Sequence, residues 1–165
     1  MKSVVMLSTM HELQMSTNDR SSELKKCLAY LKSEFKAQKS VDIQVVMEEW
    51  HDDRGESAAR EFATRSGLQW ANVGTPDEGQ FRTYRNPICF CAHNGTLRSD
   101  GNAPQMREYG PFEKQEAREN RMVQNVRAAM QKYESGILIV GDNHLHSIFG
   151  KLRSSGFNVC GFSYL

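Results

Sequence analysis

Two short apolar runs in this chain read as buried β-strands, and a histidine follows each of them at the same spacing. Residues 4–7 (Val-Val-Met-Leu) precede His11 by four positions, and residues 137–140 (Ile-Leu-Ile-Val) precede His144 by four positions. A continuous apolar run of this length is typical of an inner strand in a parallel sheet. Because the carboxyl ends of parallel strands share one edge, both imidazoles are expected at the edge where open α/β sheets bind ligands.

A third apolar run adds carboxylates to the same edge. Residues 45–47 (Val-Val-Met) are followed directly by Glu48 and Glu49. Successive side chains of a strand point to opposite faces, so only one of the two carboxylates should face the histidines, and the sequence does not say which. We expect that carboxylate to lie near His11 and His144.

Strand patterns alternate with helix patterns along the chain, which predicts an α/β fold. The expected architecture has three layers: a mostly parallel five-stranded sheet with helices on both faces. Helices are predicted at residues 21–38, 55–66, 112–134 and 145–152, and strands at residues 4–7, 42–48, 68–73, 136–141 and 157–162.

Residues 74–110 do not follow this alternation. They include three of the four prolines and the turn dipeptide Asn94-Gly95, which predicts a long flap-like insertion over the sheet edge. No linker divides the chain, so residues 1–165 are expected to form a single α/β domain.

Charge and composition narrow the class of function. Lys plus Arg (21) nearly balance Asp plus Glu (20), which argues against nucleic acid as a partner. That alternative stays open because four arginines fall in the insertion: Arg82, Arg85, Arg98 and Arg107. There is no apolar stretch of membrane-spanning length and no signal-peptide pattern, and the four cysteines are scattered, so we expect a cytoplasmic protein without a membrane partner.

The helix predicted at residues 112–134 can bring a cation to the same edge. Its apolar positions include Met122 and Val126, and three and four residues before Met122 this stripe reaches Glu119 and Arg118. Because this helix leads into the strand at 136–141, its first turns should lie near the histidines. Two interpretations remain open: Arg118 reaches a ligand, or Arg118 and Glu119 form a solvent-facing pair.

Four short elements occur in a set order along the chain: a Gly-x-x-His-like element, a glutamate, an Arg-Glu element and a second Gly-x-x-His. They read Ser8-Thr9-Met10-His11, Glu48-Glu49, Arg118-Glu119-Asn120 and Gly141-Asp142-Asn143-His144. This order resembles the erythromycin esterase / ChaN / TraB / Tiki superfamily. Ser8 stands where that family usually has glycine, so a turn that requires glycine would be distorted here.

The resemblance implies a cluster of histidines and a glutamate at one sheet edge, used differently in different branches. Tiki-type proteins are described as metal-dependent peptidases, and the antibiotic esterases use the cluster to activate water. ChaN-type members bind haem. The reaction therefore does not follow from the fold alone.

The chemistry of the residues permits two mechanisms. Two neutral imidazoles and a carboxylate can hold one divalent metal ion with an open position for water, which predicts His11, Glu48 and His144 as metal ligands. Without a metal, a histidine could accept a proton from water while Glu48 or Glu49 orients it. Arg118 would then stabilise negative charge on a carbonyl or phosphoryl oxygen. The predicted catalytic set is His11, Glu48, Glu49, Arg118 and His144.

Two functions follow. The first is a small hydrolase that activates water at the sheet edge and acts on an ester, amide or phosphoester in a small-molecule or peptide substrate. The second is a non-catalytic protein of the same fold that binds a small molecule, a metal or haem. The sequence does not indicate the oligomeric state.

Two further candidates are better explained without a function. His146 follows His144 by two positions on a predicted helix and is expected to face solvent. The pair Cys89 and Cys91 with His93 lacks the second pair that tetrahedral sulfur ligation requires.

Overall fold

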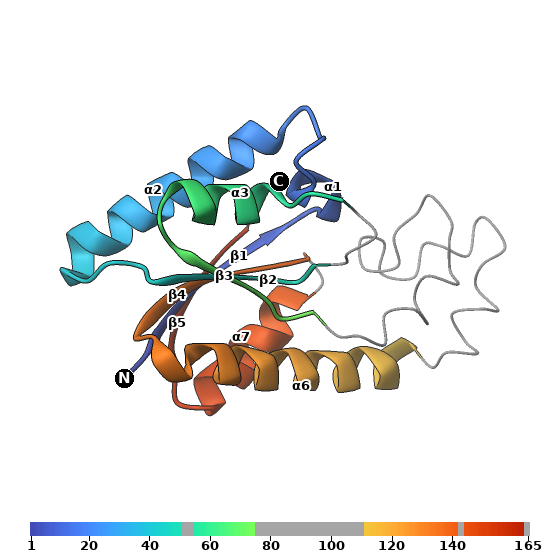
Figure 1. Ribbon diagram of the computed structural model, residues 1–165. Coiled ribbons are helices and arrows are strands. Elements are labelled where there is room, and N and C mark those ends of the chain that lie inside the picture. The colour runs from blue at the N-terminus through green and yellow to red at the C-terminus, as the bar shows by residue number, and fades with distance from the viewer. Residues whose placement is uncertain (51–54, 75–110, 142–143, 164–165) are drawn as a thin grey trace, which may run out of the picture.

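The computed structural model describes residues 1–50, 55–74, 111–141 and 144–163, built around a five-stranded sheet (Figure 1). The strands, in the spatial order β3-β2-β4-β1-β5, are β3 (Gln69–Asn72), β2 (Val45–Glu48), β4 (Ser135–Gly141), β1 (Ser3–Thr9) and β5 (Asn158–Ser163). All neighbouring strands are parallel, so all five carboxyl ends lie at one edge. The predicted insertion falls, apart from Gly74, outside the described residues.

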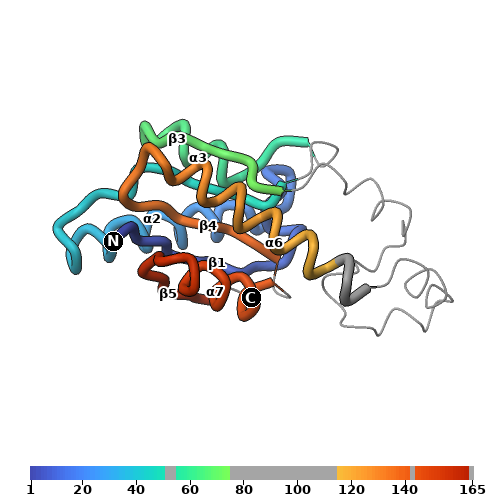
Figure 2. The backbone as a smooth tube through the Cα atoms, turned by 90° about the horizontal axis from the view of Figure 1, so that it is seen from below, coloured from blue at the N-terminus to red at the C-terminus, as the bar shows by residue number. Residues whose placement is uncertain are grey.

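Helices cover both faces of the sheet, which confirms the predicted three-layer α/β architecture. In Figure 1, α2 (Ser21–Lys39) and α3 (Ala58–Arg65) lie above the sheet, and α6 (Pro111–Ala129) and α7 (Leu145–Ser154) lie below it. Figure 2 shows α6 and α7 side by side on the lower face. A single 3-10 turn, η5 (Met130–Lys132), connects α6 to β4.

The central strands β1 and β4 are buried on both faces, which explains their continuous apolar sequence. Side chains alternate between two cores because successive residues of a strand point to opposite faces. Val5 and Leu7 pack in the core under α2 and α3, whereas Val4 and Met6 pack in the core formed with α6 and α7. The same alternation continues to the polar residues at the strand ends.

The helices begin and end close to their predicted bounds, and capping residues mark several of these ends. The Ser57 hydroxyl accepts a hydrogen bond from Arg60 N at 3.0 Å and caps α3. Gly67 and Gly156 have positive φ angles of 68° and 90° after α3 and α7, as C-terminal glycines commonly do. One short helix, α1 (His11–Gln14), was not predicted, because a single turn is too short to show a helical repeat.

Ser8 causes no distortion before His11. It lies within β1, in register with Val140 of β4, and its φ angle is not positive. The expectation that this position requires a glycine is therefore wrong for this chain.

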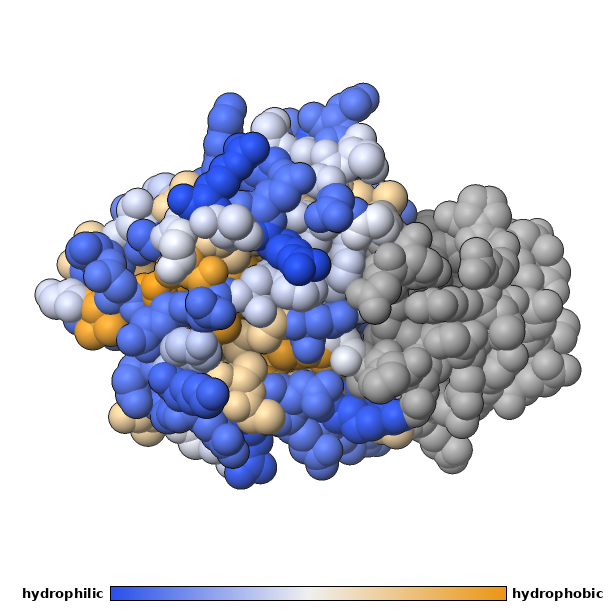
Figure 3. Space-filling view, in the orientation of Figure 1, coloured by the Kyte–Doolittle hydropathy of each residue, from blue (hydrophilic) through white to orange (hydrophobic). Residues whose placement is uncertain are grey.

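The surface shown in Figure 3 is broken into small apolar patches separated by hydrophilic side chains. Within the described ranges, no helix combines the length and the apolar character needed to cross a bilayer.

Gly136 marks a close contact between β4 and its surroundings. A Cβ atom at this position would lie 2.8 Å from Val45 Cγ1, 2.9 Å from Met47 Cε and 3.1 Å from Met130 Sδ. In a densely packed core these neighbours cannot all move without cost.

We predict that Gly136→Ala lowers the free energy of unfolding by about 1–3 kcal/mol through overpacking. Gly150→Ala is the matched control, because a Cβ at this position of α7 would meet no atom within 4 Å. Helix propensity predicts that this control is neutral or stabilises by up to about 1 kcal/mol. Urea unfolding of both variants tests the prediction, and equal stabilities would contradict it.

Candidate active site

The structure brings His11 and His144 to the same edge of the sheet. His11 is the first residue of α1, just after β1, and His144 is the N-cap of α7, just after β4. The last residues of the two strands, Thr9 and Gly141, are register partners. A Cβ atom on Gly141 would lie 2.7 Å from Nε2 and 2.8 Å from Cε1 of His11. The imidazole therefore lies over the end of β4 in space that only a glycine leaves open.

Glu48 and Glu49 point to opposite faces of the sheet, as the strand alternation predicts. The Glu48 carboxylate is buried on the side of α2 and α3. It accepts hydrogen bonds from Gln14 Nε2 at 3.1 Å, from Trp70 Nε1 at 2.9 Å and from the Ser57 hydroxyl. The residue that caps α3 therefore also holds Glu48.

Glu49 is the carboxylate that lies beside His144. It forms a buried ion pair with Arg118, and its Oε2 accepts a hydrogen bond from Gly141 N at 3.1 Å. Its Oε1 lies 3.7 Å from His144 Nε2. Burial alone would raise the pKa of Glu49, but the Arg118 guanidinium, the two imidazoles and the Gly141 N–H outweigh it and hold that pKa well below its usual range.

The second nitrogen of the His144 ring faces Glu119. His144 Nδ1 and Glu119 Oε1 are 2.9 Å apart, and Glu119 also accepts hydrogen bonds from the Ser147 hydroxyl and from Gln115 Nε2 at 3.2 Å. Burial would raise the pKa of Glu119, but these hydrogen bonds and the imidazole lower it overall. An ionised carboxylate only accepts hydrogen bonds, so the neutral His144 ring carries its proton on Nδ1 and its lone pair on Nε2.

Arg118 and Glu119 face inward, and the interpretation of a solvent-facing pair is wrong. Their exposed fractions are only 4% and 3%. They contact different partners: Arg118 pairs with Glu49 and lies 3.4 Å from His144 Nε2 through Nη1, whereas Glu119 contacts His144 Nδ1. Helix α6 thus places the guanidinium of Arg118 and the carboxylate of Glu119 at the carboxyl edge of the sheet.

Gln14 connects the two faces and was missed by sequence reasoning. Its Oε1 lies 2.9 Å from His11 Nδ1, and its Nε2 donates to Glu48 Oε1 and to the Glu49 backbone oxygen, both at 3.1 Å. A polar residue three positions after His11 can contact the histidine if the segment forms a helical turn, but the sequence does not predict that turn.

Thr9 adds a second buried polar group that the sequence did not single out. Its side chain is fully buried, and its hydroxyl makes no hydrogen bond. As the register partner of Gly141, Thr9 points to the same face of the sheet as the His11 ring.

The predicted metal ligands do not come together around one point. Glu48 lies on the face of α2 and α3, and on the other face the Arg118 guanidinium occupies the space next to Glu49 and His144. A bound cation there would have to displace a buried cation. Among the residues that the structure describes, no three His, Cys, Asp or Glu side chains are arranged to hold a metal ion. The metal site therefore stays a prediction from the sequence, and the described contacts do not add support for it.

The remaining candidates lie away from the edge or outside the described residues. His146 is exposed, as expected. Residues 89–93 and the four arginines of the insertion fall within 75–110, which the structure does not describe.

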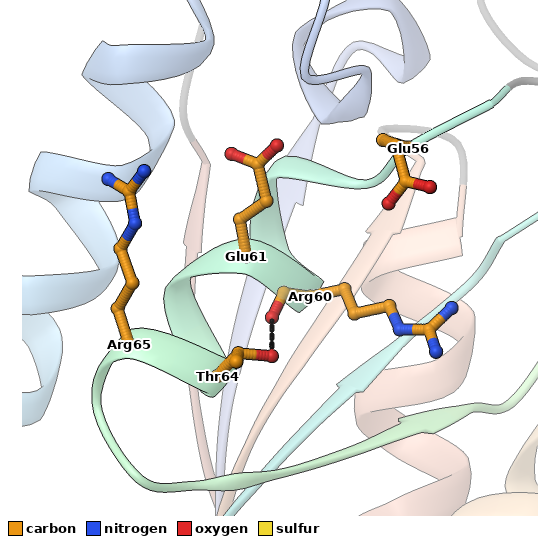
Figure 4. A pocket seen from close by; sticks show the side chains of 5 residues that line it. All are labelled: Glu56, Arg60, Glu61, Thr64 and Arg65. Atoms are coloured by element: carbon orange, nitrogen blue, oxygen red, sulfur yellow. Dashed lines mark hydrogen bonds between the residues drawn. The ribbon is translucent and has the colours of Figure 1, made fainter.

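A hollow on α3 contains none of the predicted site residues. It is lined by Glu56, Arg60, Glu61, Thr64 and Arg65. Figure 4 shows Arg60 and Arg65 pointing away from each other, and Glu61 is paired with Lys25. These side chains do not converge on a common ligand.

Comparison with protein-family models, with curated proteins and with solved structures found no match. The resemblance carried by the four short elements therefore remains a hypothesis, and the geometry of the edge has to support any function.

We predict that Glu49→Gln lowers the free energy of unfolding by about 3–5 kcal/mol, because it leaves the buried Arg118 charge without its partner. Urea unfolding at neutral pH measures this. Glu116→Gln is the matched control: Glu116 is 70% exposed and lies 3.5 Å from Lys151 in a surface pair, so its loss should cost less than about 1 kcal/mol. Equal losses in the two variants would contradict the assigned role of Glu49.

The lowered pKa values of Glu49 and Glu119 also predict how stability depends on pH. A carboxyl whose folded pKa is depressed stabilises the protein fully above its unfolded pKa of about 4.3. That contribution is lost as the pH falls through the lower folded value. The urea midpoint should therefore fall on acidification below about pH 4.3, and fall less steeply in Glu49→Gln. An unchanged slope in the variant would show that Glu49 does not titrate as described.

Proposed function

We propose that this protein is a hydrolase that activates water at the carboxyl edge of its sheet, with His144 as the general base and Glu119 as the group that orients it. The observation that carries the proposal is the contact of 2.9 Å between His144 Nδ1 and Glu119 Oε1, both buried. An imidazole held in this way by a carboxylate is the arrangement that general-base catalysis requires.

The proton follows a defined route in this mechanism. As water attacks, one of its O–H bonds breaks, the proton moves to the Nε2 lone pair of His144, and the oxygen bonds to the carbonyl carbon or phosphorus of the substrate. The resulting imidazolium lies between Glu119 and Glu49, whose Oε1 is 3.7 Å from Nε2. Both carboxylates stabilise this charge until Nε2 returns the proton to the leaving group.

Arg118 is placed to stabilise the negative charge that develops on the substrate oxygen. Its guanidinium is buried beside Glu49 and His144, and a fixed positive charge in such a place can stabilise that oxygen. Arg118 Nη1 lies 3.4 Å from His144 Nε2, which is longer than an ordinary hydrogen bond. Glu49 keeps the guanidinium in position.

The proposed substrate is a small molecule or peptide with an ester, amide or phosphoester bond. The order of the histidine, glutamate and arginine elements, which resembles a superfamily with hydrolase branches, supports the same class. No step requires a metal ion, and the donor set at the edge does not favour one.

We predict that His144→Ala and Glu119→Gln each lower kcat by about 10²–10⁴-fold, the contribution typical of a positioned general base. His146→Ala is the matched control, because His146 is an exposed imidazole on the same helix. The measurement is turnover of a panel of p-nitrophenyl carboxylic esters, anilides and phosphoesters. Activity lost only in the control, or equal in all variants, would contradict the role of His144, and no turnover of any class by the wild-type protein would contradict the proposed function.

A further inference from the structure

We infer that Gln14 is a positioning residue that fixes the His11 ring with its proton on Nδ1 and its lone pair on Nε2. This makes His11 a second oriented imidazole at the sheet edge, and Glu48 then acts on His11 through the Gln14 amide. The orientation of the ring stands on its own geometry, whereas its use in catalysis rests on the proposed function.

The orientation of the Gln14 amide is decided by its contacts. Its Nε2 lies 3.1 Å from Glu48 Oε1 and 3.1 Å from the Glu49 backbone oxygen. Both partners are oxygen acceptors, so the NH₂ group must face them. Turning the amide over would place its oxygen against two oxygens and lose both hydrogen bonds, which is costly for a fully buried side chain.

The amide orientation in turn decides the tautomer of His11. With its nitrogen turned to Glu48 and Glu49, Gln14 presents its carbonyl oxygen to His11 Nδ1 at 2.9 Å. That oxygen can only accept, so Nδ1 must carry the hydrogen. In the neutral ring the lone pair is then on Nε2, the atom that lies over Gly141.

The supporting contacts hold Gln14 rigidly. Glu48 is held by the Ser57 hydroxyl and by Trp70 Nε1, and a backbone bridge between Met15 and Ser57 ties the end of α1 to the start of α3. His11 and Gln14 are three positions apart in α1, which places both side chains on one side of the turn. Turning the His11 ring over would lose its hydrogen bond to the Gln14 carbonyl oxygen, which these contacts hold in place.

The two imidazoles of the edge are therefore oriented in the same sense by different means. His144 contacts a carboxylate, that of Glu119, directly. His11 contacts the neutral amide of Gln14, which in turn donates a hydrogen bond to the Glu48 carboxylate. A neutral amide orients the ring but adds no charge next to Nδ1, so it supports the imidazolium form less than a carboxylate does. Under the proposed function, His11 would act as a hydrogen-bond acceptor that positions water while His144 takes the proton.

The decisive experiment is ¹⁵N NMR of the histidine side chains in the wild-type protein at about pH 8, above the ordinary imidazole pKa of about 6.5. We expect His11 to show a protonated Nδ1 and an unprotonated Nε2. His146, which is exposed, is the internal reference and should show the Nε2–H form that predominates in water. A His11 ring with a bare Nδ1, or with both nitrogens protonated at this pH, would overturn the inference.

A variant tests whether Gln14 is the cause. Gln14→Met keeps the length of the side chain and removes the carbonyl oxygen and the NH₂ group of the amide, so we expect His11 to shift towards the Nε2–H form. We also expect kcat to fall about 10²-fold, at the low end of a general-base contribution. Gln69→Met, at an exposed position of β3, is the matched control and should change neither readout. A His11 tautomer unchanged in Gln14→Met would overturn the role of Gln14.

The two proposals can fail separately in this design. The NMR measurement on the wild-type protein needs no folded variant and no substrate. If the tautomer is as stated and no substrate is turned over, the proposed function fails and the orientation of His11 stands. If hydrolysis is found with the opposite tautomer, the inference fails and the proposed function stands.

Discussion

The buried ion pair between Glu49 and Arg118 is the interaction on which the rest of the edge depends. It joins the end of β2 to α6, and the second oxygen of Glu49 accepts the N–H of Gly141 at the end of β4. Three elements distant in sequence are thus fixed relative to one another at the point where the strands end. His144 lies against this pair, so the position of its Nε2 is set by Arg118 and Glu49 as well as by Glu119.

The alternation of side chains along β2 divides the edge into two halves. Glu48 points to the face of α2 and α3 and reaches His11 through Gln14. Glu49 points to the other face and lies beside Arg118 and His144. One strand with two consecutive glutamates therefore supplies a carboxylate to each histidine, and the two halves meet at Gly141, which has no side chain to separate them.

The sequence predicted the layers, the sheet and most element bounds because the apolar repeats are long and regular. Leu24, Leu28 and Leu31, for example, repeat at helical spacing and form the buried side of α2. The convergence of His11 and His144 on one edge also follows from the sequence, since it needs only parallel strands.

The partners of each site residue could not be predicted in the same way. The sequence left open which of Glu48 and Glu49 faces the histidines, although the predicted metal ligands included Glu48. The structure places Glu49 next to His144, and this choice depends on where β2 begins. Gln14 was missed because the turn that presents it has no repeat. Ser57 was missed because its contact with Glu48 crosses from one element to another. Contacts of this kind depend on tertiary packing, which has no local pattern in the sequence.

The composition of the edge supports the proposed function. Replacing a buried ion pair by apolar side chains of similar size is often neutral or stabilising, because desolvation of the charges costs as much as their attraction returns. Here the chain keeps an ion pair, two imidazoles and two further carboxylates buried next to an apolar core that packs well without them. Thr9, with a buried hydroxyl that makes no hydrogen bond, adds a further cost at the same place. Stability alone gives no reason to collect such groups at one strand edge, whereas oriented imidazoles beside a guanidinium are what the activation of water requires.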